Sequence, residues 1–135
     1  MIVLSNSTEQ TLLAGQSLTF DLVPLRTGCA ESHRVGTGSV RLRYPGVYDI
    51  HFSANVGGTV ANTPVQLAIE LGGDVLRETT MISTPSAADV FNNVAKRTYV
   101  KNCPNDYDRI TVTNTGTSDV VVAPNASLTI GRLSG

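Results

Sequence analysis

The chain has two histidines, His33 and His51, which are the residues best suited to activate a nucleophile. Hydrolysis by a serine, threonine or cysteine needs a base beside the hydroxyl or thiol, and that base is usually a histidine. His33 lies in a polar segment, His51 lies on the polar side of an alternating segment, and no Gly-x-Ser-x-Gly turn accompanies either. The sequence therefore favours surface histidines and predicts that the chain is not an enzyme.

Asp106 and Asp108 are the carboxylates with the most suggestive spacing. Two aspartates separated by one residue can share a calcium ion in a loop. The remaining oxygen ligands of an EF-hand loop are missing from this segment, and turns before strands favour Asn and Asp in any case. No other Asp or Glu pair stands out for glycoside hydrolysis. We expect a solvated turn here, with neither a metal nor a cofactor.

The two cysteines, Cys29 and Cys103, both lie in polar, turn-like segments. Neither has a second cysteine nearby, which excludes a Cys-x-x-Cys redox or zinc motif. Two free thiols are the ordinary state in a reducing compartment. A Cys29–Cys103 disulfide is the alternative, because a β-sandwich could bring the two loops together. The sequence leaves both alternatives open.

Composition and charge exclude several kinds of partner. The net charge is -1, from 10 Lys and Arg against 11 Asp and Glu. Nucleic-acid binding needs clustered basic residues, and none of the charges form a run. The longest apolar stretches are far shorter than the ~20 residues that span a bilayer, so we expect no membrane contact. Residues 1–4 lack the features of a signal peptide, and we expect synthesis in the cytoplasm.

The surface is expected to carry few charges, among them several basic residues on predicted strands. Only 16% of the residues are charged, so we expect part of the surface to be covered in the working state. Arg41 and Arg43 on one strand, and Lys96, Arg97 and Lys101 on another, could bind acidic partners. Charges of this kind also discourage aggregation through sheet edges, and the sequence favours that reading.

Alternation of apolar and polar residues is the dominant pattern and predicts β-strands. It is clearest over residues 47–56, where a helix would scatter the apolar side chains around its circumference. Residues 64–71 repeat it before Gly72-Gly73-Asp74, which is typical of a hairpin turn that continues over residues 75–80. Further strands are predicted over residues 16–23, 39–44, 96–102, 107–114, 119–123 and 127–133.

These elements must form an antiparallel two-sheet sandwich, because no long helix is available to connect parallel strands. We expect eight to ten short strands in a single domain over residues 1–135, with residues 1–15 as an N-terminal arm or first strand. Residues 86–89 could open one helical turn. The loops are predicted over residues 26–38, 57–63, 83–88 and 102–106.

Two motifs carry a resemblance to a known family. Arg43-Tyr44-Pro45-Gly46-Val47-Tyr48-Asp49-Ile50-His51-Phe52 resembles a strand of C1q/tumour-necrosis-factor-like jelly rolls, in which the glycine turns the chain and the aromatics enter the core. Ala126-Ser127-Leu128-Thr129-Ile130-Gly131-Arg132-Leu133 resembles the final strand of bacterial exosporium proteins and bacteriophage virion proteins of this fold. The resemblance implies a trimer-forming, all-β jelly-roll sandwich.

The same resemblance suggests what the chain does. It implies a structural virion protein, a homotrimeric bacteriophage capsid decoration or head-fibre component that is made in the host cytoplasm. Its partners would be sister copies and the major capsid protein or another virion protein. The alternative is a receptor- or carbohydrate-binding tip domain of a phage fibre or bacterial surface protein. Tyr99 and Tyr107 are the candidate residues for contact with a host-surface glycan.

Overall fold

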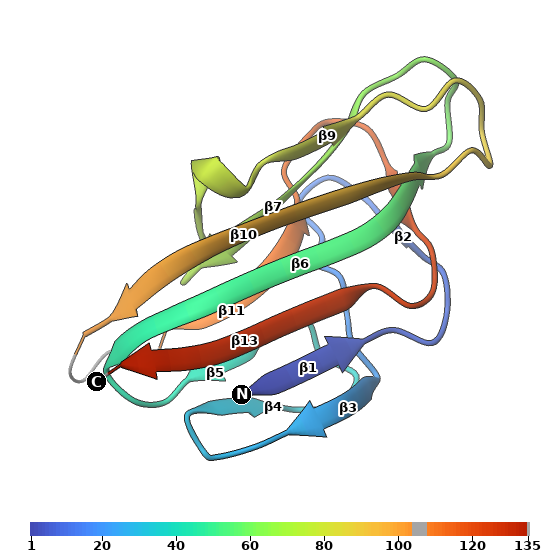
Figure 1. The fold of residues 1–135 in the computed structure, drawn as a ribbon. Helices are drawn as coiled ribbons and strands as arrows, with labels where there is room; N and C mark the ends of the chain where they lie inside the picture. Colours follow the sequence, from blue (N-terminus) through green and yellow to red (C-terminus); the bar gives the residue numbers. More distant parts are fainter. Residues whose placement is uncertain (104–107, 135) are drawn as a thin grey trace.

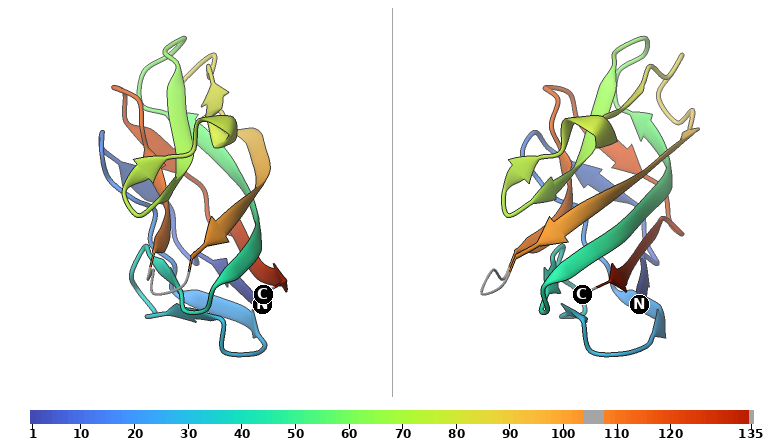
Figure 2. Two further views of the ribbon diagram at one scale, coloured as in Figure 1. Left: turned by 90° about the vertical axis from the view of Figure 1, so that its left-hand side faces the viewer. Right: turned by 60° about the vertical axis from the view of Figure 1, so that its left-hand side comes forward.

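The computed structural model describes residues 1–103 and 108–134, which form two antiparallel sheets packed face to face. Figure 1 views the molecule with one sheet in front of the other, and Figure 2 turns it so that the two layers are seen from the side. Both layers are built from strands that are distant in the sequence. The predicted antiparallel two-sheet sandwich is confirmed.

The sheet nearer the viewer in Figure 1 has seven strands with the long β6 at its centre. β6 pairs with β10 along one side and with β13 and β12 along the other, and β1 and β3 follow beyond β13. β2 extends the sheet from β12. The strands are β1 (Ile2–Ser5), β2 (Gln10–Leu12), β3 (Leu22–Arg26), β6 (Gly46–Gly58), β10 (Asn92–Asn102), β12 (Val120–Val122) and β13 (Ser127–Ser134).

The second sheet has six strands and lies behind the first in Figure 1. Its order is β4-β5-β11-β7-β8, and β9 also pairs with β7. A short 3-10 turn, η1 (Arg77–Thr79), separates β8 from β9. The strands are β4 (Glu31–His33), β5 (Val40–Leu42), β7 (Val65–Leu71), β8 (Asp74–Val75), β9 (Met81–Ser83) and β11 (Arg109–Asn114).

The core lies between the two sheets and is built by the alternation seen in the sequence. Tyr48, Ile50 and Phe52 of β6 are fully buried, and they meet inward side chains of the opposite sheet such as Leu67 and Ile69. A buried aliphatic or aromatic side chain contributes about 1.5–3 kcal/mol through the hydrophobic effect. The inward residues of both sheets therefore account for most of the stability of this fold.

Buried asparagines tie the ends of strands together where backbone pairing stops. Asn114, at the end of β11, donates from Nδ2 to the carbonyl oxygens of Leu12 at 2.9 Å and Ser118 at 2.8 Å. Asn6 accepts the backbone N–H of Ala126 at 2.9 Å. Because Leu12 belongs to the other sheet, Asn114 joins the two layers. Its loss would leave buried carbonyl groups unpaired.

Three sequence predictions differ from the structure. The segment 16–23 is not one strand: Leu18 and Phe20 are buried as expected, but Leu22 is 40% exposed because the chain there leaves the six-stranded side and enters the other sheet as β3. The predicted loop 26–38 contains β4. After β8 the chain forms η1 rather than continuing as a strand to residue 80.

The structure corrects the length of one strand and the place of the helical turn. β10 begins at Asn92, four residues before the predicted start, because it pairs with β6 from Asn92 to Asn102. Residues 86–89 form no helix, and Asp89 has a positive φ of 67°. The described residues form thirteen strands in place of the expected eight to ten. No helix in this part of the chain is long and apolar enough to cross a membrane.

Candidate functional site

The outward side of the seven-stranded sheet is a continuous surface built from regular structure. Strand pairing places one residue from each of five strands in a row across it, because side chains alternate between the two sides of a strand. That row is Leu25, Val3, Thr129, His51 and Arg97, from β3, β1, β13, β6 and β10 in turn.

Short side chains lie around His51 near the centre of this surface. Ser53 on β6 and Ser127 on β13 are directly opposite each other, and Gly131 lies further along β13. The Met1 side chain lies over Gly131, where an added Cβ would be 3.9 Å from its Cγ. We call the surface formed by Met1, Val3, Leu25, Val47, Ser53, Ser127, Thr129 and Gly131 the flat face. Its small residues let another surface approach the backbone closely.

Apolar side chains lie at the margin of the flat face. Leu25 is 43% exposed and Val3 and Val47 are half-buried. Leu133, at the end of β13, is also exposed. Exposed single apolar residues are ordinary, but several on one face together are typical of a contact surface. The flat face therefore combines a smooth centre with an apolar margin.

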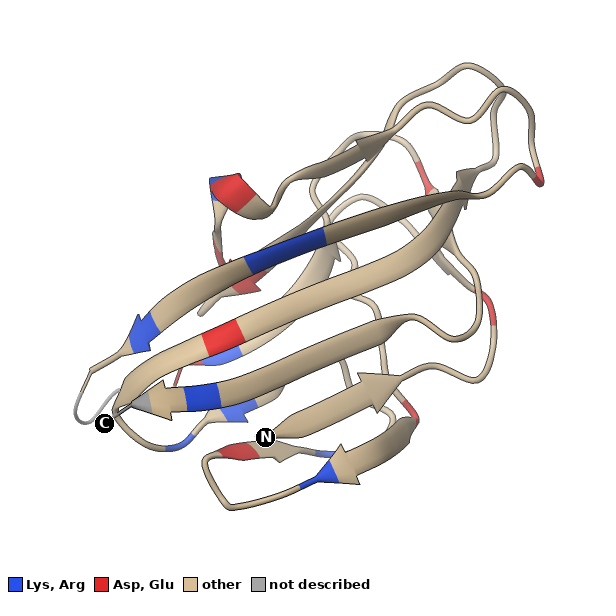
Figure 3. Ribbon diagram, in the orientation of Figure 1, with Lys and Arg blue, Asp and Glu red and all other residues tan. Residues whose placement is uncertain are grey.

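One ion pair lies beside Gly131 of the flat face, because Asp49 is directly opposite that residue. Arg97 of β10 donates from Nε to Asp49 Oδ1 at 2.8 Å and from Nη2 to Oδ2 at 2.6 Å, which is a two-pronged guanidinium–carboxylate pair. The hydrogen bonds from Arg97 hold the pKa of Asp49 below its usual value. Figure 3 shows the charges on the nearer sheet gathered toward its left, while the right-hand part of the sheet carries none.

Tyr99 lies beside this ion pair, and Tyr107 falls outside the described residues. Tyr99 is on the outward side of β10 and is 55% exposed. The Arg97 guanidinium lies over its ring, with Cζ 5.4 Å from the ring centroid. This stacking is a cation–π contact. Tyr99 therefore presents an exposed ring, and a role of Tyr99 and Tyr107 in glycan contact stays a prediction.

The two histidines lie on different sheets and form no common site. His33 of β4 is half-buried, and its ring nitrogens contact the carbonyl oxygens of Ser39 at 3.0 Å and Phe20 at 3.1 Å. Those contacts hold β4 against its neighbours. His51 is exposed on the outward side of β6, in the row between Thr129 and Arg97. His51 therefore has the surface position that the sequence predicted.

The remaining candidates from the sequence are the two cysteines and the aspartates at positions 106 and 108. Cys29 and Cys103 are both exposed and free, so the structure has the two thiols rather than the disulfide. Asp106 lies outside the described residues, while the Asp108 carboxylate lies against Gly72, where an added Cβ would be 2.9 Å from its Oδ1. Within residues 1–103 and 108–134, no three His, Cys, Asp or Glu side chains gather around a possible metal position.

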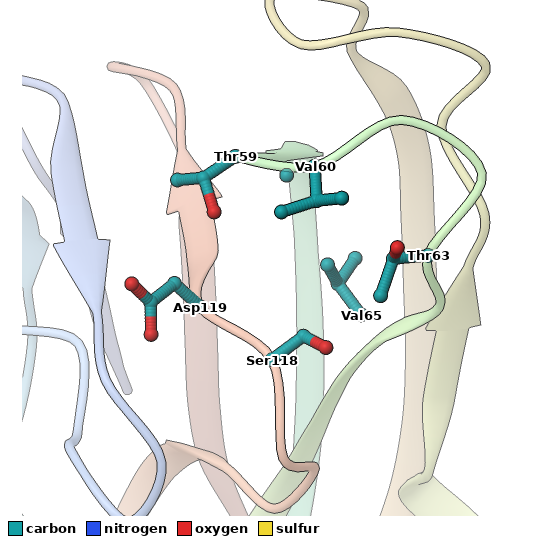
Figure 4. Close-up of a pocket in the computed structure, with 7 residues that line it drawn as sticks. Thr59, Val60, Thr63, Val65, Ser118 and Asp119 are labelled. Atoms are coloured by element: carbon teal, nitrogen blue, oxygen red, sulfur yellow. The ribbon is translucent and has the colours of Figure 1, made fainter.

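Figure 4 shows a hollow at one end of the sandwich, lined by two loops. Thr59, Val60 and Thr63 come from the loop after β6, and Ser118 and Asp119 come from the segment before β12. Its volume is about 10 Å³, close to the space that one water molecule needs. This hollow is too small for a ligand.

Comparison with known proteins identifies the fold. No protein-family model matches the chain, and no curated protein matches it in sequence. A crystal structure of murine APRIL at pH 5.0 is similar over 98% of both chains, with 18% identity and a TM-score of 0.68. The globular domain of zebrafish complement 1qA protein is similar over 95% of this chain and 94% of that one, with 13% identity and a TM-score of 0.67.

These similarities show that the chain has a C1q/tumour-necrosis-factor-like jelly-roll fold, as the sequence motifs predicted. They extend over almost the whole chain, so the flat face belongs to the shared part of the fold. The sequence did not single out that face, because its residues come from strands that are distant in the chain, such as β1 and β13. The sequence showed the alternation within each strand, but it did not show the register that places these residues side by side.

Proposed function

We propose that this chain is a structural assembly protein that forms a homotrimer through the flat face. The observation that carries the proposal is the combination of short side chains at its centre with exposed apolar residues at its margin. Small residues allow a sister protomer to approach the sheet, and burial of Leu25 and Val3 would remove apolar surface from water. The Asp49–Arg97 pair balances two of the charges beside this face, while Lys101 of β10, opposite Val47, is an exposed cation at its border.

The edge of β10 is the partner surface that fits this face. Among the described strands, β10 pairs with β6 alone, and its other edge has only side-chain hydrogen bonds, to Ser83 of β9 and Glu78 of η1. An edge of one protomer against the face of the next makes two different surfaces meet, and such contacts close into a ring when the rotation fits. Lys96 and Lys101 on that edge keep it from adding strands indefinitely.

We further propose that the trimer is a component of a bacteriophage virion, either a capsid decoration protein or part of a head fibre. The resemblance of residues 43–52 and 126–133 to particle proteins of this fold supports it. The fold itself is generally non-enzymatic, which supports an assembly role rather than catalysis. The major capsid protein or another virion protein would hold the trimer on the particle.

The mass of the purified protein in solution tests the assembly. Light scattering at micromolar concentration should give about three times the chain mass of 14.3 kDa. A protein that remains a single chain under these conditions contradicts the trimer.

Mass spectrometry of particles purified from cells that produce the chain tests the virion role, because a decoration protein stays with the particles through purification. Its absence from the particles contradicts that role and leaves the trimer standing.

A glycan-binding tip domain is the second candidate, and the exposure of Tyr99 favours it. Sugar rings pack on exposed aromatic faces, and one face of Tyr99 is covered by Arg97 while the ring is 55% exposed overall. Binding to a glycan array that disappears in Tyr99→Ala would favour this function. Phe91→Ala is the control, because Phe91 is another exposed aromatic residue that lies against Gly57 instead.

A further inference from the structure

A hollow lined by arginines lies on the outward side of the six-stranded sheet, away from the flat face. Its volume is about 350 Å³. Among the described residues, three arginines and three hydroxyl side chains line it, and no carboxylate does. We call it the arginine hollow, and its residues are Ser32, Arg34, Thr37, Ser39, Arg41 and Arg109.

Strand register brings these residues together from distant parts of the chain. Ser32 of β4 is opposite Arg41 of β5, and Arg41 is opposite Arg109 of β11. The neighbours of Arg41 along β5, Val40 and Leu42, are fully buried, so alternation turns Arg41 outward. Two guanidinium groups from neighbouring strands therefore share one side of the sheet.

Among the described residues that line the hollow, no acidic side chain balances the charges of Arg34 and Arg109. The ion pairs among the described residues are Met1–Glu31 and Asp49–Arg97, so neither Arg34 nor Arg109 takes part in one. Arg109 donates from Nη1 to a neutral partner, the Ser39 hydroxyl, at 3.2 Å. Like charges side by side repel each other, and a bound anion would relieve that repulsion.

Two described acidic residues line an adjoining hollow. Glu70 and Asp108 line a neighbouring hollow of about 440 Å³ that shares Ser39 and Arg109 with the first. The Asp108 carboxylate lies against Gly72, which follows β7. β7 pairs with β11 on the side opposite β5 and Arg41. One end of this surface is thus basic and the other acidic, with Arg109 between them.

We propose that the arginine hollow binds a tetrahedral oxyanion, a sulfate or phosphate group, free or as an ester on a sugar. Guanidinium groups present paired N–H donors that match the oxygens of such anions. The hydroxyls of Ser32, Thr37 and Ser39 supply further donors around the same space. The volume exceeds that of a bare anion and lies within the range of small-molecule sites, so a sugar ring can be accommodated.

This site does not depend on the proposed trimer. The arginine hollow and the flat face lie on the outward sides of opposite sheets, so contact through the flat face leaves the hollow open. The ligand would therefore bind to the single chain as well as to the assembly. A variant that is monomeric should keep its anion affinity.

Titration calorimetry at constant ionic strength tests the proposal with the purified protein. The probes are inorganic sulfate, inorganic phosphate, glucosamine 6-sulfate and glucose 6-phosphate, with glucose as the uncharged control. We expect the anions to bind and glucose not to bind. Tighter binding of the sugar esters assigns the site to a saccharide, while equal binding of ester and inorganic anion assigns it to the anion alone.

Single substitutions locate the site. Arg109→Gln should weaken anion binding by about tenfold or more, because it removes a charged hydrogen-bond donor. Arg43→Gln is the matched control: it removes the same charge from an exposed residue whose guanidinium lies 5.9 Å from the Tyr44 ring, outside the hollow. It should change affinity by less than about twofold. Arg34→Gln, on an exposed loop, gives a second test if Arg109→Gln fails to fold.

Two results would overturn the proposal. One is the absence of binding for all four anions at about 20 mM, a concentration at which a weak but specific site is filled. The other is an equal loss of affinity in Arg43→Gln and Arg109→Gln, which would show general attraction to a basic surface. The circular dichroism spectra of the variants must match the unsubstituted protein for the comparison to count.

Discussion

The outward sides of the two sheets differ in almost every property that decides what they can contact. On the seven-stranded sheet, Ser53, Ser127 and Thr129 lie around His51 with an apolar margin beyond them, and Asp49 is paired with Arg97. On the six-stranded sheet, Arg41 and Arg109 stand together among hydroxyl groups beside a hollow of about 350 Å³. The first suits a dry contact between protein surfaces, and the second suits a hydrated, charged ligand.

In this fold, the core and the outward surfaces of the two sheets are determined by different residues of the same strands. Every second residue of a strand is committed to the core, where volume and shape are fixed by close packing. The residues between them meet no such constraint, so one sheet can carry a protein contact while the other carries a small ligand site. A substitution on the outward surface of one sheet should therefore change the function of that surface and leave the other surface intact.

The largest effect is expected from a charge placed at the centre of the flat face. Thr129→Arg puts a long cation where a sister protomer would approach, and an unpaired buried charge costs far more than the contact gains. We expect the solution mass to fall from three chains to one in light scattering.

Thr111→Arg is the matched control for that substitution. Thr111 is a half-buried threonine on the outward side of β11 in the other sheet. Its replacement should leave the mass at three chains. If Thr111→Arg separates the chains and Thr129→Arg does not, the contact surface has been assigned to the wrong sheet.

The next effect concerns the asparagine that joins the two layers. Asn114→Ala leaves the carbonyl oxygens of Leu12 and Ser118 without their donor, so the free energy of unfolding should fall by about 2–3 kcal/mol. Asn93→Ala removes only an exposed hydrogen bond to Asn55 and should cost less than about 0.5 kcal/mol. Urea unfolding of both variants measures the difference, and equal losses would refute the bridging role.

A smaller effect should follow the titration of Asp49. Because Arg97 lowers the pKa of Asp49 in the folded protein, the pair adds stability above the unfolded pKa of about 3.9 and loses it as the pH falls through the lower folded value. The advantage of the unsubstituted protein over Asp49→Asn in melting temperature should therefore be full at neutral pH and vanish in strong acid. Working in Thr129→Arg keeps assembly from contributing, and a difference that grows on acidification contradicts this assignment.

The smallest effect is expected for Arg97→Gln at neutral pH. The Arg97 side chain is 57% exposed, and exposed ion pairs contribute little because water and salt screen them. We expect the melting temperature to fall by no more than about 3 °C, and by less when salt is added. A larger decrease that salt does not reduce would mean that Arg97 acts through packing on Tyr99 instead.

Much of the fold could be predicted because alternation is a local property of each strand. Residues 47–56 and 64–71 alternate cleanly, and both became long buried strands. β4 was missed because Glu31, Ser32 and His33 carry no apolar pattern, and it is a strand only because β5 lies beside it. The start of β10 at Asn92-Asn93 was missed for the same reason, since pairing with β6 extends it.

The surface sites could not be predicted to the same extent, because they depend on register. The sequence placed Arg41 and Arg43 on one face of a strand, but the residue that completes the hollow is Arg109, which lies far along the chain and is opposite Arg41 only through the β5–β11 pairing. Arg43, the nearer neighbour in sequence, takes no part in it. Tyr99 was a candidate by residue type alone, and its exposure follows from the outward side of β10, which pairs with β6.

The position of β13 between β6 and β1 has a consequence for how the protein folds. The last strand of the chain is inserted beside the first, so β1 has no neighbour toward the middle of its sheet until β13 arrives. Contacts between residues so far apart in sequence form slowly, because a long loop must close before they contribute. On the ribosome, the earlier strands would wait with their apolar sides uncovered, and chaperones that shield nascent chains should raise the yield of native protein.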